Sequence, residues 1–121
     1  MPASVDYFER KLDDKRRLTI PANVRAEFAD GYVVTVGFGE YLHLYPASVW
    51  ETEVEPALQG SILDESIADL NVKFRQGKSE GSLDQKQGRI VLEQHQIEHA
   101  GITGHVKAVR AGKYWRILAD Q

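Results

Sequence analysis

The stretch LDDKRRLTI, residues 12–20, shows how this chain is organised, because it recurs as LDQKQGRIVL, residues 83–92. Both copies place an aspartate after a leucine, a lysine two residues further on, and an arginine at the start of a short apolar run. Such self-similarity indicates a duplicated unit, and a unit of about 45 residues is too small to bury a core alone. The two units are therefore expected to pack against each other.

The residues around each copy predict the same order of elements in both halves. A strand precedes the loop, a short strand and a brief helix follow it, and a hairpin closes the unit. Pro21 is expected to start the first helix, and Gly101 to end the second in the left-handed conformation. The expected strands are 7–12, 18–20, 32–36 and 41–45 and then 78–83, 90–92, 105–109 and 114–118, with helices at 22–28 and 93–100. The predicted fold class is therefore mainly β with short helices, an α+β domain.

Residues 48–77 connect the two halves and are predicted to be helical. Ser48 and Glu51 have the spacing of a capping box, which predicts a helix from there to about residue 58. A second helix is expected over 64–74, where Ile67, Leu70 and Phe74 form an apolar stripe at helical spacing. The predicted division of the chain is a first repeat at 1–47, a helical acidic connector at 48–77 and a second repeat at 78–121, with the two repeats in one compact unit.

Charge is segregated along the chain. The formal net charge is −3, from 15 Lys and Arg against 18 Asp and Glu, and taken alone it argues against a nucleic-acid partner. Residues 9–25, however, hold six basic residues against three acidic ones, and residues 70–89 hold five against two. Residues 51–69 hold six carboxylates and no base. Folding could therefore gather the two basic segments on one face, away from the acidic connector.

These residues resemble the MraZ family, which belongs to the AbrB/SpoVT group of swapped-hairpin transcription factors. The resemblance covers nearly the whole chain and rests on LDDKRRLTIP (12–21), which matches the family's Asp-x-x-x-Arg loop, on LHLYP (42–46) with the following Trp50 and Glu51, and on HAGI (99–102). It implies a tandem swapped-hairpin β-barrel of two pseudo-symmetric repeats, assembled into a ring-like homo-oligomer that binds repeated boxes on double-stranded DNA. It also implies a sequence-specific regulator of a bacterial division and cell-wall gene cluster, in the cytoplasm and at the nucleoid.

The sequence departs from the family pattern at four places. Arg16 stands where the family normally has glycine, so that turn is expected to need another backbone conformation. Asp84 to Arg89 spans five steps instead of four, which indicates an inserted residue. Glu93 lies in the region where the family usually has a proline that starts a helix. The sequence ends at Gln121, just after the last expected strand, where the family commonly continues into a helix.

Five residues of the two loops are assigned to DNA binding, and two more are assigned to orienting the loops. Arginine presents a planar fork of donors that fits two phosphate oxygens or the O6/N7 edge of guanine, so Arg17 and Arg89 are predicted to be the principal contacts. The neighbouring cations are expected to neutralise phosphates, and the two aspartates of the motif to form and orient the turns. The phosphate neutralisers are Lys15, Arg16 and Lys86, and the loop-orienting residues are Asp13 and Asp84.

Three other interpretations stay open. The first is that the basic residues are only a solvated hairpin tip. The second is an AbrB-like antitoxin or protein-interaction module, whose acidic connector holds a partner protein. The third is a zinc hydrolase, because His95, Glu98 and His99 satisfy the H-x-x-E-H pattern with both histidines on one helical face.

The zinc interpretation is the weakest of these, because the only carboxylate after Glu98 is Asp120 and the predicted helix is short. The protein is therefore not expected to be an enzyme, and no metal, cofactor or small-molecule substrate is predicted. The chain has no cysteine and no apolar run of the roughly 18 residues that a membrane helix needs, so no membrane partner is predicted either. His43 is expected simply to alternate with Leu42 and Leu44 on a strand.

Overall fold

The computed structural model describes residues 5–120, which form two antiparallel sheets with short helices. Six strands form one sheet in the order β1-β7-β8-β4-β3-β5, and β2 pairs with β6 in a separate ribbon. The predicted class, mainly β with short helices, is confirmed, and within residues 5–120 the strands do not close into a barrel. The strands are β1 (Tyr7–Lys11), β2 (Arg17–Thr19), β3 (Tyr32–Val36), β4 (Leu42–Pro46), β5 (Ser79–Gly81), β6 (Arg89–Val91), β7 (His105–Ala111) and β8 (Tyr114–Ala119).

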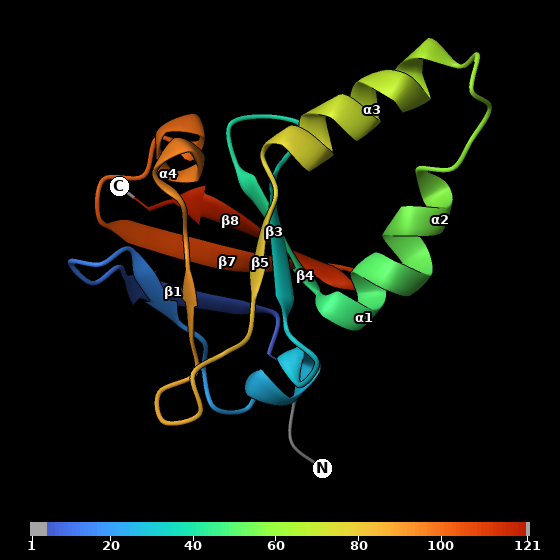
Figure 1. Cartoon of the computed structure of the whole chain (residues 1–121). Coiled ribbons are helices and arrows are strands. Elements are labelled where there is room, and N and C mark those ends of the chain that lie inside the picture. The colour runs from blue at the N-terminus through green and yellow to red at the C-terminus, as the bar shows by residue number, and fades with distance from the viewer. Residues whose placement is uncertain (1–4, 121) are drawn as a thin grey trace.

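The two halves of the chain exchange strands. β1 comes from the first half but pairs with β7 of the second-half hairpin, and β5 comes from the second half but pairs with β3 of the first-half hairpin. β4 and β8 join the two hairpins at the centre of the sheet. In Figure 1 the blue β1 accordingly lies beside the orange-red β7, and the yellow β5 beside the teal β3. Each half therefore completes its sheet with a strand of the other half.

The ribbon of β2 and β6 is made from the two echoed stretches of sequence. Leu18 and Ile90 are fully buried in the main core. Because side chains alternate along a strand, the residues on either side of these two face outward. The register aligns Arg17 with Val91, Leu18 with Ile90 and Thr19 with Arg89.

The ribbon is extended at both ends by matching hydrogen bonds. At one end the backbone N–H of Leu92 donates to the carbonyl of Arg16 at 2.9 Å, and at the other end the N–H of Ile20 donates to the carbonyl of Gly88 at 2.8 Å. Ile20 and Leu92 are 72 residues apart, as are Arg16 and Gly88. The two bonds are therefore made by equivalent residues of the two echoed stretches.

The central strands β3 and β4 are buried almost completely, because both faces of the sheet are covered there. Val34 and Leu44 point into the main core, which also holds the buried residues of the ribbon. Val33 and Tyr45 point the other way, toward a second cluster that the connector supplies. The connector side of this second cluster consists of the buried Trp50, Leu58 and Phe74 with the half-buried Val49, Val54 and Leu70.

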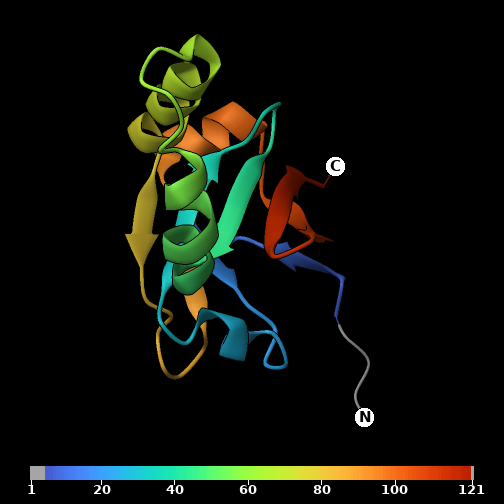
Figure 2. The same cartoon turned by 90° about the vertical axis from the view of Figure 1, so that its right-hand side faces the viewer.

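The connector is helical, as predicted, and projects to one side of the sheet (Figures 1 and 2). Its last helix, α3, is capped by Asp64, whose carboxylate accepts the N–H groups of Ser66 and Ile67. Phe74 is buried in the second cluster beside Val33 of β3, and Leu70 packs against the same cluster, so two of the three residues of the predicted stripe belong to the core, whereas Ile67 does not. The helical segments are α1 (Ala47–Val49), the π-helical turn η2 (Trp50–Val54), α2 (Glu55–Ala57) and α3 (Glu65–Gln76).

The capping box predicted at Ser48 is wrong. The helix begins at Ala47, and its N-cap Pro46 makes no side-chain cap. The N–H of Ala47 instead donates to the carbonyl of Gly31 at 3.0 Å. The backbone at Gly31 therefore supplies the acceptor that a capping side chain would provide. Ser48 lies inside the helix, where its carbonyl accepts the hydroxyl of Thr52 at 2.8 Å.

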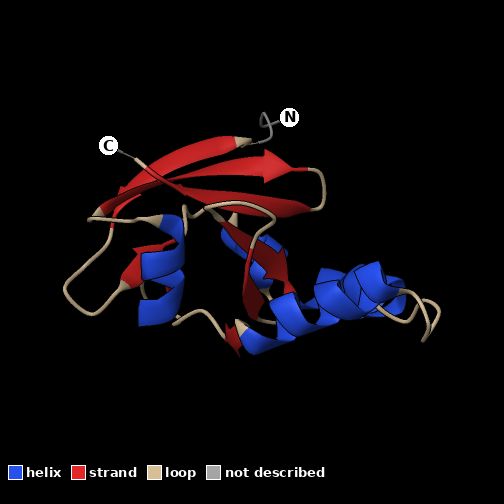
Figure 3. Cartoon of the chain, turned by 90° about the horizontal axis from the view of Figure 1, so that it is seen from above, coloured by secondary structure: helices blue, strands red, loops and turns tan. Residues whose placement is uncertain are grey.

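The two remaining helices differ from each other more than the sequence predicts. In the first half only a 3-10 helix, η1 (Arg25–Phe28), forms, because Pro21 starts a tight turn in which its carbonyl accepts the N–H of Val24. In the second half α4 (Gln94–Ala100) has a capping box between Glu93 and Gln96, and it ends at Gly101 with φ 65°, as predicted. Figure 3 shows the helices on one side of the long strands. Within residues 5–120 no helix is long and apolar enough to cross a membrane.

Candidate nucleic-acid interface

The first loop folds around the carboxylate of Asp13. Its Oδ1 accepts the backbone N–H groups of Lys15 and Arg17, both at 2.9 Å, and its Oδ2 accepts Nε of Arg17 at 2.6 Å. Burial alone would raise the pKa of Asp13, but the hydrogen bonds from Arg17 and Lys15 outweigh it and hold the pKa below its ordinary value. The ionised carboxylate therefore closes the turn and fixes the Arg17 side chain.

The second loop repeats this arrangement around Asp84, despite its extra residue. Oδ1 of Asp84 accepts the N–H of Arg89 at 2.6 Å, and Oδ2 accepts the N–H of Gln87 at 3.2 Å. Nη2 of Arg89 lies 3.3 Å from Oδ2 of the same carboxylate. The backbone bond from Arg89 is the largest cause of a lowered pKa at Asp84, although burial opposes it. The pairing of aspartate with arginine is thus the same in both loops.

Arg16 and Gly88 occupy the same position in their loops and adopt the same backbone conformation. Their φ angles are 60° and 61°. The expectation that Arg16 requires another conformation is therefore wrong: it keeps the left-handed conformation of a glycine, which costs an ordinary residue about 1–2 kcal/mol. Two bonds to one residue offset this cost, since the Arg16 carbonyl accepts the N–H of Leu92 and its Nε donates to the Leu92 carbonyl at 3.1 Å.

Arg17 and Arg89 lie on the same outward face of the ribbon, at diagonal positions of β2 and β6. The Asp13 carboxylate reaches both, with Oδ2 at 2.6 Å from Nε of Arg17 and at 3.9 Å from Nη1 of Arg89. The two arginine side chains remain 29% and 23% exposed. The structure therefore brings the two predicted arginines, one from each half, into a single cluster, which we call the arginine face.

The remaining predicted cations, Lys15, Arg16 and Lys86, are exposed at the tips of the two loops. Within residues 5–120 none of these three takes part in an ion pair. The golden loop that carries Lys86 hangs below the body in Figure 1, while the connector helices lie to its right. The loop cations are thus free to meet an anion in the part of the chain that the structure describes.

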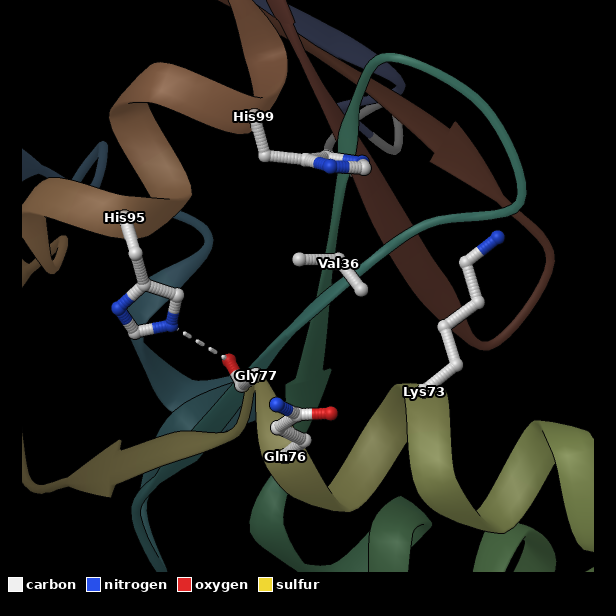
Figure 4. A pocket seen from close by; sticks show the side chains of 6 residues that line it. All are labelled: Val36, Lys73, Gln76, Gly77, His95 and His99. Atoms are coloured by element: carbon white, nitrogen blue, oxygen red, sulfur yellow. Dashed lines mark hydrogen bonds between the residues drawn. The ribbon is translucent and has the colours of Figure 1, made fainter.

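The H-x-x-E-H residues do not form a metal centre. Nε2 of His95 lies 3.3 Å from the carbonyl of Gly77, and Nε2 of His99 lies 2.8 Å from the carbonyl of Gly39. Both rings border an open hollow of about 520 Å³ between α4, the end of α3 and β3 (Figure 4). Among residues 5–120 no three His, Cys, Asp or Glu side chains are grouped to hold a metal ion. Each ring instead ties α4 to a neighbouring segment.

His43 is a buried member of an aromatic cluster, which alternation alone did not indicate. It is fully buried on β4, with Nδ1 at 2.8 Å from the hydroxyl of Tyr45. Burial, with smaller contributions from Arg116 and Lys73, lowers the pKa of His43 to about 4, so the ring is neutral at pH 7. The rings that surround it belong to Phe38, Tyr41, Tyr45, Phe74 and Tyr114.

One arginine beside the second loop was not assigned from the sequence. Arg25, on η1, donates from Nε to the carbonyl of Ile20 at 2.8 Å and lies next to Gly88. No spacing signal points to it, because the residue 72 positions later is the apolar Ile97.

Comparison with known proteins finds a matching family and several similar proteins. Residues 6–66 match the family described as "MraZ protein, putative antitoxin-like". A protein named Transcriptional regulator MraZ from Herpetosiphon aurantiacus is 41% identical over 96 residues, which cover 79% of this chain and 66% of that protein. Proteins of the same name from Roseiflexus castenholzii and Clostridium acetobutylicum are 37% and 30% identical, over 94% and 87% of this chain and 79% and 73% of their own length.

Proposed function

Because the chain belongs to the MraZ family, whose members named above are transcriptional regulators, we propose that it regulates transcription by binding double-stranded DNA with the arginine face. The observation that carries this proposal is the meeting of Arg17 and Arg89 on one outward face of the ribbon. Either guanidinium can offer paired donors to phosphate oxygens or to guanine. Because they come from different halves of the chain, one ligand can engage both halves together.

The electrostatics of the molecule support this assignment despite its negative net charge. The exposed loop-tip cations lie within three residues of Arg17 or Arg89 in the sequence, where they can neutralise phosphates. The carboxylates of residues 51–69 lie in the connector, which projects away from the second loop in Figure 1. Asp13 and Asp84 hold the two arginines in place, and both arginine side chains remain partly exposed and can be reached by a ligand.

We also propose that residues 1–47 and 78–121 are two pseudo-symmetric swapped-hairpin repeats of one unit, with 48–77 as their connector. The exchange of β1 and β5 between the hairpins supports this division. A ring-like homo-oligomer would then display many arginine faces, and avidity would strengthen weak single contacts. Such a regulator would act at the nucleoid in the cytoplasm, on repeated boxes near division and cell-wall genes.

The test is a gel shift with the double variant Arg17→Ala, Arg89→Ala. DNA fragments are first selected from a random pool by the unaltered protein, and the variant is expected to lose binding to them while its thermal unfolding stays cooperative. Lys113→Ala is the matched control, because it removes an exposed cation paired with Glu53 of the connector. Undiminished binding by a folded double variant would overturn the proposal.

A protein-interaction role is the second candidate, and the antitoxin-like description of the family favours it. Its signature would be a small basic protein that co-purifies with the chain through the acidic connector, with no DNA selected from the pool. The family's regulator names, and the carbonyl contacts of His95 and His99, support a non-enzymatic role without a metal.

A further inference from the structure

Arg25 belongs to the first half of the chain but lies over the second loop. Its Nε donates to the carbonyl of Ile20 at 2.8 Å, at the end of β2. A Cβ added to Gly88 would lie 2.2 Å from this Nε, which shows how closely the side chain covers the loop. Together they border a hollow of about 380 Å³, whose other lining residues are Phe28, Ala29, Ser82, Leu83, Asp84 and Gln85.

The same contact exists at the other end of the ribbon, made by a different residue. Nε of Arg16 donates to the carbonyl of Leu92, the residue equivalent to Ile20. By the same offset of 72, the equivalent of Arg16 is Gly88, and the equivalent of Arg25 is Ile97. Each end of the ribbon therefore has one guanidinium bound to the carbonyl that ends the strand. At one end it comes from the loop, and at the other end from η1.

This contact leaves the outer nitrogens of Arg25 available. Within residues 5–120 neither Nη1 nor Nη2 of Arg25 takes part in a hydrogen bond or ion pair, whereas Nε is fixed. A guanidinium held at Nε presents its two Nη groups as a fork of set direction, which suits two oxygens of one phosphate. The nearby carboxylate of Asp84 does not compete for this fork, because it is bonded to Arg89 and Gln87.

We propose that Arg25 contacts a DNA phosphate beside the second loop, as the counterpart of Arg16 beside the first. The inference rests on the proposed DNA-binding function and adds a residue to it. It gives each end of the ribbon two arginines and one lysine, although the second loop itself has glycine at position 88. The ends carry Lys15, Arg16 and Arg17 on one side and Lys86, Arg89 and Arg25 on the other.

The test measures how the dissociation constant for a selected DNA fragment depends on salt. Each lost phosphate contact lowers the slope of log K against log salt by about 0.9 per bound chain, so the unaltered protein loses roughly 3.5-fold more affinity per chain between 50 and 200 mM salt than Arg25→Gln does. Arg25→Lys, which keeps a cation, is expected to retain most of the slope. Lys113→Gln removes a cation that is paired with Glu53 of the connector, and this variant is expected to retain the full salt slope.

Thermal unfolding of the same variants separates a contact from a merely structural role. A structural Arg25 would change the melting temperature of Arg25→Gln but leave its salt slope unaltered, and that result overturns the inference. An equal loss of slope in Lys113→Gln also overturns it, because the effect would then be one of net charge. If the unaltered protein selects no DNA, the proposed function fails instead, so the two failures are distinguishable.

Discussion

Gly88→Ala probes the two features that make the second loop, its left-handed turn and its cover by Arg25. Gly88 has φ 61°, a conformation that costs alanine about 1–2 kcal/mol. The new Cβ would lie 2.2 Å from Nε and 2.5 Å from Cδ of Arg25, so this side chain must move and lose its bond to Ile20, at about 0.5–1.5 kcal/mol. The reduced entropy of the unfolded alanine chain returns about 0.4–1 kcal/mol.

The net destabilisation is therefore about 0.5–3 kcal/mol. Unfolding entropy near 2.1 cal/mol/K per residue gives about 4 °C per kcal/mol for 121 residues, so the melting temperature is expected to fall by about 2–12 °C. Calorimetry or circular dichroism at fixed protein concentration measures this directly.

Gly101→Ala is the matched control for the backbone part of this cost. Gly101 has φ 65°, but nothing lies within 4 Å of an added Cβ, so only the conformational cost, about 0–1.5 kcal/mol after the entropy gain, is expected. In an Arg25→Ala background Gly88→Ala should cost about as much as Gly101→Ala. If Gly88→Ala costs the same with and without Arg25, the reasoning about this contact is refuted.

Three further outcomes are expected. Gln96→Leu removes the buried amide that donates to two backbone carbonyls and to Ser79, and should destabilise the fold by about 2–4 kcal/mol in urea titrations; a loss below about 1 kcal/mol would contradict the buried network. His43 has a folded-state pKa of about 4 against 6.5 for the free side chain, so the unfolded state binds more protons as pH falls and stability should drop by about 2 kcal/mol at pH 5. His43→Phe should remove that drop, and an unchanged pH profile would exclude His43 as its source. Because His95 and His99 bond to backbone carbonyls, EDTA should leave the melting temperature unaltered. Stoichiometric zinc in protein that was purified without added metal would contradict this assignment of the two histidines.

The echoed loops were predictable because their chemistry is local. The spacing of Asp13 and Arg17 predicts a turn in which the aspartate accepts backbone N–H groups two to five residues ahead. The carboxylate of Asp84 accepts the N–H of Arg89 in the same way, despite the extra residue in that loop. The hairpins were equally predictable, since alternation and glycine turns are signals within one segment.

Features that depend on distant contacts were not predictable. The helix start at Ala47 depends on the carbonyl of Gly31, sixteen residues earlier, so the local capping pattern at Ser48 was misleading. Arg16 can keep a strained conformation because Leu92 holds it, and no local rule contains that partner. The pairing of β1 with β7 likewise follows from the packing of the two halves, which a strand pattern does not specify.

The exchange of strands has a consequence for how the polypeptide can be divided. Ile62 and Leu63 are 94% and 91% exposed at the turn between the connector helices, so scission there would cut no strand. The two fragments would still bind each other, because β1 of the first pairs with β7 of the second and β5 of the second pairs with β3 of the first. Co-expressed as separate polypeptides, the two fragments should reconstitute the fold. The covalent link would then serve only to raise the effective concentration of one half near the other.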